Sequence, residues 1–214
     1  MSTHTAPPPS ASAPPGGAEG AAPAAHLDAP AAHLDPAGFA FARSAWLPVS
    51  PERVYDLVSE VSHIGLWSPN ASRVRYDDGA GPRPGAWFGG HNRGGGREWD
   101  SRSQVLTARP GAEFAYVVGG TADGIVRWRW TMRADGPGSL VTQHWQLLRM
   151  DPVLGATRRE VEALRDAMAA SAETTLTALA KWLHTTPHTT SRTTTGAGTT
   201  TDGKDAADVT DVIA

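Results

Sequence analysis

The stretch VSPERVYDLVSEVSHIGLWSP, residues 49–69, decides the fold of this chain. Ser50 is a favoured helix N-cap and Pro51 suits the first helical position, so a helix is expected to begin here. Apolar residues then recur at helical spacing, namely Val54, Leu57, Val58 and Val61. Trp67-Ser68-Pro69 ends the helical run, because the residue before a proline avoids the α conformation. The stretch therefore predicts the end of a strand, two short helices and an aromatic turn.

Segments on both sides of this stretch predict strands separated by turns. The expected strands are residues 39–49, 73–76, 86–92, 97–109, 113–118, 125–132 and 140–148. Glycine, proline and aspartate occupy the connections between them, which is typical of tight turns. Strands joined by such short connections pair as antiparallel hairpins.

The pattern becomes helical over residues 157–183. One stripe there is apolar and comprises Val161, Leu164, Met168, Ala172, Leu176, Leu179 and Leu183. A helix of this length extends about 40 Å, enough to cross the concave face of a curved sheet. The sequence therefore predicts an α+β domain. A curved antiparallel sheet of about seven strands wraps around a long C-terminal helix, with two short helices after the first strand.

Composition divides the 214 residues into three parts. Residues 1–38 are rich in Ala, Pro and Gly and contain no aromatic residue, and residues 185–214 are rich in Thr with an acidic end. Neither segment can bury enough apolar surface to offset its ordering entropy, so both are predicted to be disordered tails. Residues 39–184 have the size of one ordinary domain with one core.

Charge and composition limit the classes of function. The predicted domain carries 17 Lys and Arg against 15 Asp and Glu, a balance that argues against a nucleic-acid partner. The chain has no cysteine, which excludes disulfides, thiolate catalysis and cysteine-ligated metals. It contains no signal peptide pattern and no apolar run long enough for a membrane span, so we expect a cytoplasmic protein.

Several motifs resemble the polyketide cyclase/dehydrase branch of the START/Bet v 1-like superfamily, the SRPBCC proteins. They are Pro51–Tyr55, Trp67–Pro69, GAWFGGHNR at 85–93, Trp99, Pro110-Gly111 with Phe114, Trp128 with Trp130, and Val141–Gln143 with Trp145. The resemblance covers residues 39–183. It implies a helix-grip fold with a deep, mostly apolar pocket between the sheet and the long helix. Superfamily members bind lipids, sterols, quinones or polyketides, and only some are enzymes, so no catalytic set carries over.

Aromatic and polar side chains that share strand faces are candidates for lining this pocket, although plain core packing produces the same pattern. The candidates are Trp67, Ser101, Ser103, Phe114, Tyr116, Trp128, Trp130, Gln143, Trp145, Val161, Leu164, Met168 and Leu176. Ser101, Ser103, Tyr116 and Gln143 would orient a ligand by hydrogen bonds. His63 lies in the second short helix near the expected pocket mouth, where it is either a gate or acid/base residue or a surface or capping residue.

No further catalytic signal appears. The chain has no GxSxG elbow and no HExxH metal motif, and nothing in it calls for a metal or a cofactor.

Three functions remain open. The first hypothesis is binding of a hydrophobic or aromatic small molecule. The second is a cyclase or aromatase that folds a poly-β-ketone, with Tyr116, Gln143 or His63 moving protons or polarising a carbonyl. The third is a partner-protein interaction module without a ligand. The sequence leaves the ligand and the oligomeric state open.

Overall fold

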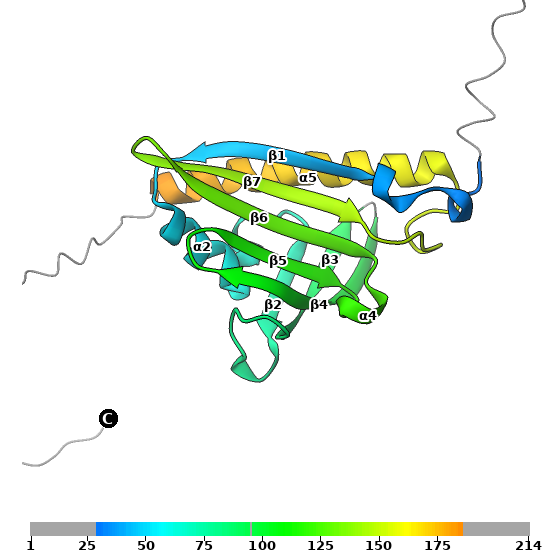
Figure 1. Ribbon diagram of the computed structural model, residues 1–214, viewed down its shortest axis with the longest axis horizontal. Coiled ribbons are helices and arrows are strands. Elements are labelled where there is room, and N and C mark those ends of the chain that lie inside the picture. Colours follow the sequence, from blue (N-terminus) through cyan, green and yellow to red (C-terminus); the bar gives the residue numbers. More distant parts are fainter. Residues whose placement is uncertain (1–28, 95, 186–214) are drawn as a thin grey trace, which may run out of the picture.

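A computed structural model describes residues 29–94 and 96–185, which form one sheet, one long helix and several short helices (Figure 1). The strands are β1 Ala40–Leu47, β2 Ala71–Tyr76, β3 Trp87–Gly94, β4 Arg97–Arg109, β5 Glu113–Val118, β6 Val126–Asp135 and β7 Gly138–Leu147. They pair antiparallel throughout in the order β1-β7-β6-β5-β4-β3-β2. The seven-stranded antiparallel sheet expected from the turn spacing is confirmed.

The short helices that follow β1 lie where the sequence predicted them. They are α2 Pro51–Ser59, η3 Val61–His63 and α3 Ile64–Trp67. The Ser50 side chain accepts a hydrogen bond from the Arg53 amide and so caps α2. Four further short helices are η1 Ala31–His33, η2 Pro36–Gly38, η4 Asp77–Gly79 and α4 Gly120–Asp123.

The long helix α5, Arg158–Thr185, runs behind β1 and β7 in Figure 1. Its start is a capping box. The Glu160 amide donates to Thr157 Oγ1, while the Glu160 carboxylate accepts from the amides of Ala156 and Thr157. No described helix is long and apolar enough to cross a membrane.

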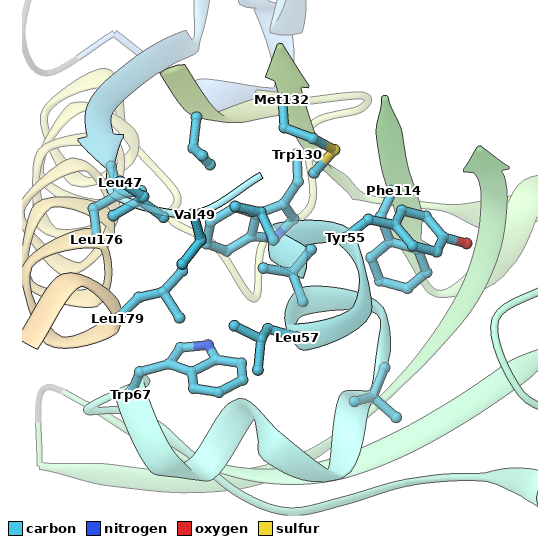
Figure 2. Packing of buried hydrophobic residues seen from close by; sticks show 14 of the residues in the cluster. Leu47, Val49, Tyr55, Leu57, Trp67, Phe114, Trp130, Met132, Leu176 and Leu179 are labelled. Carbon is cyan, nitrogen blue, oxygen red and sulfur yellow. The ribbon is translucent and has the colours of Figure 1, made fainter. Parts of the chain in front are cut away.

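The core consists of two apolar clusters between the sheet and the helices. The first cluster joins α2, the C-terminal half of α5 and the strands, and Figure 2 shows Leu57, Leu176, Leu179 and Trp130 converging there. The second cluster surrounds Trp145, Leu147, Val126 and Val161. We call the sheet face that carries these residues the inner face and the opposite one the outer face.

Residues 29–38, assigned above to the N-terminal tail, pack against the domain. Ala31 is buried in the second cluster, and its amide donates to the Ala156 carbonyl at 2.8 Å. The Arg158 amide donates in turn to the Ala29 carbonyl at 2.9 Å. Amino-acid composition cannot predict backbone hydrogen bonds between distant segments. For this reason the domain boundary predicted from composition was residue 39. Residues 1–28 and 186–214 lie outside the described residues, so their predicted disorder stays a prediction.

Candidate ligand-binding interior

Two neighbouring rows of paired residues cross the inner face of the sheet. The first row comprises Arg43, Gln143, Trp130 and Phe114, and the second comprises Phe41, Trp145, Trp128 and Tyr116. The alternation of side chains along each strand places these residues on one face. The register therefore brings six of the sequence candidates side by side, facing α5.

Gln143 is the most informative residue of the first row. Its side chain is 6% exposed, and its Oε1 atom is buried without a hydrogen-bond partner among the described protein atoms. A buried polar atom without a partner costs about 1–3 kcal/mol. A fold that tolerates this cost leaves an open acceptor in its interior.

The break between the two core clusters passes through Gln143. On β7, Val141 belongs to the first cluster and Trp145 to the second, with Gln143 between them. On α5, Leu176 belongs to the first and Met168 to the second, and the small buried residue Ala172 lies between them. Arg43 pairs with Gln143 in the sheet, and its Nε atom lies 2.5 Å from Glu173 Oε1 of α5. The break on β7 and the break on α5 therefore lie beside each other. Gln143 on β7 and Ala172 on α5 thus both lie between the two apolar clusters.

Tyr116 supplies a second polar group in the interior. Its ring packs against Phe88 and Phe114 at centroid distances of 5.0 and 5.8 Å, and burial raises the pKa of its hydroxyl. The hydroxyl therefore stays protonated near neutrality and can donate a hydrogen bond. No side-chain hydrogen bond occupies it within residues 29–94 and 96–185.

The two candidate serines occupy the inner face of β4. Ser103 is buried opposite Phe88, and Ser101 Oγ accepts a hydrogen bond from Asn92 Nδ2 at 2.8 Å. Sequence reasoning missed Asn92 and Arg43 as inner-face residues. The signal was the two-residue period, since Asn92 is in phase with Phe88 and Arg43 with Phe41.

The remaining candidates divide between solid core and a more open region. Phe114, Trp130, Trp145, Val161 and Leu176 are buried. Trp128, Tyr116, Leu164, Met168 and Ser101 are only half-buried. These five side chains are therefore partly accessible to solvent, whereas the first five are not.

Trp67 and His63 form a separate group at the turn before β2. Trp67 is 3% exposed and meets Trp182 of α5 edge-on at 6.0 Å, while the His63 ring meets Trp67 at 6.1 Å. His63 Nδ1 is buried without a described partner. No described contact joins His63 to Tyr116 or Gln143, so the structure does not assemble these three into one constellation.

Two hollows formed by the described residues open on the outer face of the sheet. One of about 130 Å³ lies over β1, β7 and β6, and one of about 400 Å³ lies over β2, β3 and β4. Neither corresponds to the enclosed cavity expected between sheet and helix. No group of three or more potential metal ligands occurs within the part of the chain that the structure describes.

A curved sheet that grips one long helix is the helix-grip arrangement of Bet v 1-like proteins. The chain belongs to the family described as polyketide cyclase/dehydrase and lipid transport, which matches residues 39–184. Among curated proteins, none matches the chain.

Solved structures similar to this chain include a polyketide-cyclase-like protein of Corynebacterium glutamicum, Cgl2372. It is 29% identical, with 68% of this chain and 91% of that chain covered and a TM-score of 0.48. The di-domain ARO/CYC protein BexL of the BE-7585A biosynthetic pathway is 19% identical over 70% of this chain and 51% of its own, with a TM-score of 0.56. Ara h 8.0201 is 12% identical over 69% and 98%, with a TM-score of 0.53. The last two show the shared fold.

Proposed function

We propose that the domain binds a hydrophobic or aromatic small molecule of a polyketide-, lipid- or quinone-like class between the sheet and α5. The observation that carries the proposal is the Gln143 Oε1 atom, which is buried without a described partner at the break between two apolar clusters. A ligand hydroxyl group, which donates to Oε1, would supply the missing hydrogen bond. The family description, which covers both polyketide cyclisation and lipid transport, supports the same class of ligand.

The spacing of the polar groups favours a ligand with two polar ends. Gln143 on β7 and Tyr116 on β5 are separated by one intervening strand and by one row. With strands about 4.8 Å apart and about 3.4 Å rise per residue, their Cα atoms lie roughly 10–12 Å apart. Trp128 and Met168, both half-buried, would contact the apolar part of a ligand held between them.

A cyclase or aromatase acting on a poly-β-ketone chain is the second candidate. The position of Tyr116 favours it, because its hydroxyl, protonated at neutral pH, can polarise a ketone carbonyl by donating a hydrogen bond. A base is harder to assign, since His63 contacts Trp67 and no described contact joins it to Tyr116. Binding is therefore the leading proposal and catalysis the rival.

Native mass spectrometry of the freshly purified full chain tests the proposal. We expect a mass increment of a small molecule that disappears when the same sample is sprayed under denaturing conditions. Absence of an increment, together with no saturable fluorescence change with the apolar probe 1-anilinonaphthalene-8-sulfonate, would contradict it. That result would favour an interior filled by its own side chains and hence the partner-protein module.

A further inference from the structure

The hollow of about 400 Å³ on the outer face is not used by the proposed function. Its lining residues are Arg73, Arg75, Asp77, Gly89, His91, Asp100 and Arg102, together with Gly90 and Ser101, which alternate with the outer-face residues along β3 and β4. Three arginines thus surround one hollow on the solvent side of a sheet. We call it the arginine hollow.

Glycine forms the floor of the arginine hollow. In the sheet register Gly89 of β3 lies between Arg75 of β2 and Arg102 of β4. With adjacent strands about 4.8 Å apart, the Cα atoms of the two arginines are about 10 Å apart with only backbone between them. A Cβ atom at position 89 would meet Arg102 Cδ at 3.3 Å, so any side chain there would crowd the hollow.

A bulge in β2 brings a further arginine to the same side. The register shifts between Ser72, which pairs with His91, and Arg75, which pairs with Gly89. Strand β2 thus advances by three residues where β3 advances by two. Ser72, Arg73 and Arg75 are exposed, while Val74 stays in the core. Arg73 takes a left-handed backbone conformation with φ 51°, which is uncommon for a residue other than glycine. Residues in such conformations cost free energy and cluster at functional sites.

The charges in the arginine hollow are unevenly compensated. Asp77 is engaged by Arg102 at 2.5 Å, and Asp100 accepts from His91 Nδ1 at 2.9 Å. Arg102 also lies over the Trp87 ring at 5.6 Å. The side chains of Arg73 and Arg75 have no hydrogen-bond or ion-pair partner among the described residues. Two guanidinium groups therefore line the hollow without an ion-pair partner, while the carboxylates of Asp77 and Asp100, which also line it, contact Arg102 and His91.

We propose that the arginine hollow binds a small phosphorylated organic molecule, independently of any ligand in the interior. Two guanidinium groups offer planar pairs of donors that match phosphate oxygens. The hollow is several times larger than a phosphate group alone, so the organic part lies over Gly89 towards Arg102 and Trp87. The phosphate binds Arg73 and Arg75.

Amide NMR of the full chain tests this site with defined probes. Inorganic phosphate and phenyl phosphate are titrated separately at low ionic strength, and the amides of Gly89, Gly90 and His91 are followed. We expect saturable shifts at these amides with both probes, and tighter binding of phenyl phosphate. Absence of saturable shifts at millimolar concentrations would overturn the site, and equal affinities would overturn its organic part.

Arginine variants separate a built site from general charge attraction. Arg73→Gln combined with Arg75→Gln should weaken phenyl phosphate binding by about tenfold or more, because both phosphate contacts are lost. The matched control is Arg53→Gln combined with Arg83→Gln, two exposed arginines outside the hollow, which should change the affinity less than about twofold. Equal weakening in both double variants would overturn the proposal.

A conservative substitution, Arg75→Lys, tests the same contact in case the double variant disturbs the folding of β2. Arg75→Lys retains the charge but loses the planar donor pair, so it should bind phenyl phosphate more weakly than the natural chain and more tightly than the double variant. Unchanged affinity in Arg75→Lys would show that the guanidinium geometry plays no part and would overturn the bidentate contact.

Discussion

At the scale of one residue, a substitution of Gln143 distinguishes ligand binding from plain core packing. Its Oε1 atom lacks a described protein partner, so Gln143→Leu removes a buried polar group that costs about 1–3 kcal/mol. We expect the ligand-free variant to be as stable as the natural chain or more stable, and ligand binding to weaken about tenfold. Thermal melts with and without the co-purified molecule measure both effects.

The control for this prediction is Gln146→Leu on the same strand. Gln146 lies on the outer face and accepts from Arg127, so its replacement should leave ligand binding unchanged. Destabilisation of the ligand-free Gln143→Leu protein would show that the amide is satisfied by the protein and would contradict the proposed role.

Trp67 is expected to anchor the turn between α3 and β2. It is 3% exposed and packs against Trp182 of α5, so Trp67→Ala should lower the free energy of unfolding by about 3–5 kcal/mol. Urea unfolding followed by circular dichroism measures the change. Trp46→Ala, at a position 45% exposed, should cost clearly less. A loss below about 1 kcal/mol at Trp67 would mean that its ring does not hold the turn in solution.

At the scale of elements, β5 and β6 share a polar contact on the outer face that gives stability a pH dependence. Glu113 is buried, and its carboxylate accepts from Arg129 at 3.0 Å and from Arg109 at 2.6 Å. The hydrogen bond from Arg129 and, after it, that from Arg109 hold the pKa of Glu113 below its usual value. A pKa lower in the folded than in the unfolded state stabilises the fold above the unfolded value, near 4.3. This contribution is lost as the pH falls through the folded pKa.

Glu113→Gln should therefore destabilise the domain by about 1–3 kcal/mol at neutral pH. The difference between the variant and the natural chain should shrink as the pH falls below about 4. Chemical unfolding at several pH values from acid to neutral checks this. Glu98→Gln, whose side chain is 60% exposed, should change stability only slightly at any pH. A Glu113→Gln difference that is constant with pH would show that the carboxylate charge is not the source of the stability.

Individual elements show which features sequence patterns can predict. The two-residue period of β7 predicted that Val141, Gln143 and Trp145 share the inner face, because strand geometry fixes that alternation. The start of α5 was predicted to within one residue by its helical period. The bulge at Arg73 could not be predicted, since a left-handed conformation outside glycine leaves no sequence signal. The pairing of Glu113 with Arg129 was equally hidden, because it depends on the register of two strands.

For the whole molecule, the order of strands and helices predicted the layers but not how completely the interior is filled. How closely Tyr116 packs against the first cluster, and Trp128 and Met168 against the second, depends on sheet curvature, which periodicity does not encode. The contact of residues 29–38 with the start of α5 is a second whole-molecule feature of this kind. This segment contributes Ala31 to the second cluster, next to Phe39. The Arg158 guanidinium lies over the Phe39 ring at 5.9 Å.

Two truncated chains test whether residues 29–38 belong to the folded domain. A chain without residues 1–28 keeps the hydrogen bonds of Ala29 and Ala31 to the segment before and at the start of α5, whereas a chain without residues 1–38 loses them. Two hydrogen bonds contribute about 0.5–1.5 kcal/mol each, and burial of Ala31 adds to this, while ordering of the segment opposes it. We expect the shorter chain to be less stable by about 1–2 kcal/mol, which lowers the melting temperature by about 2–4 °C per kcal/mol. Calorimetry of both chains measures the difference, and equal melting temperatures would show that the segment only rests on the domain surface.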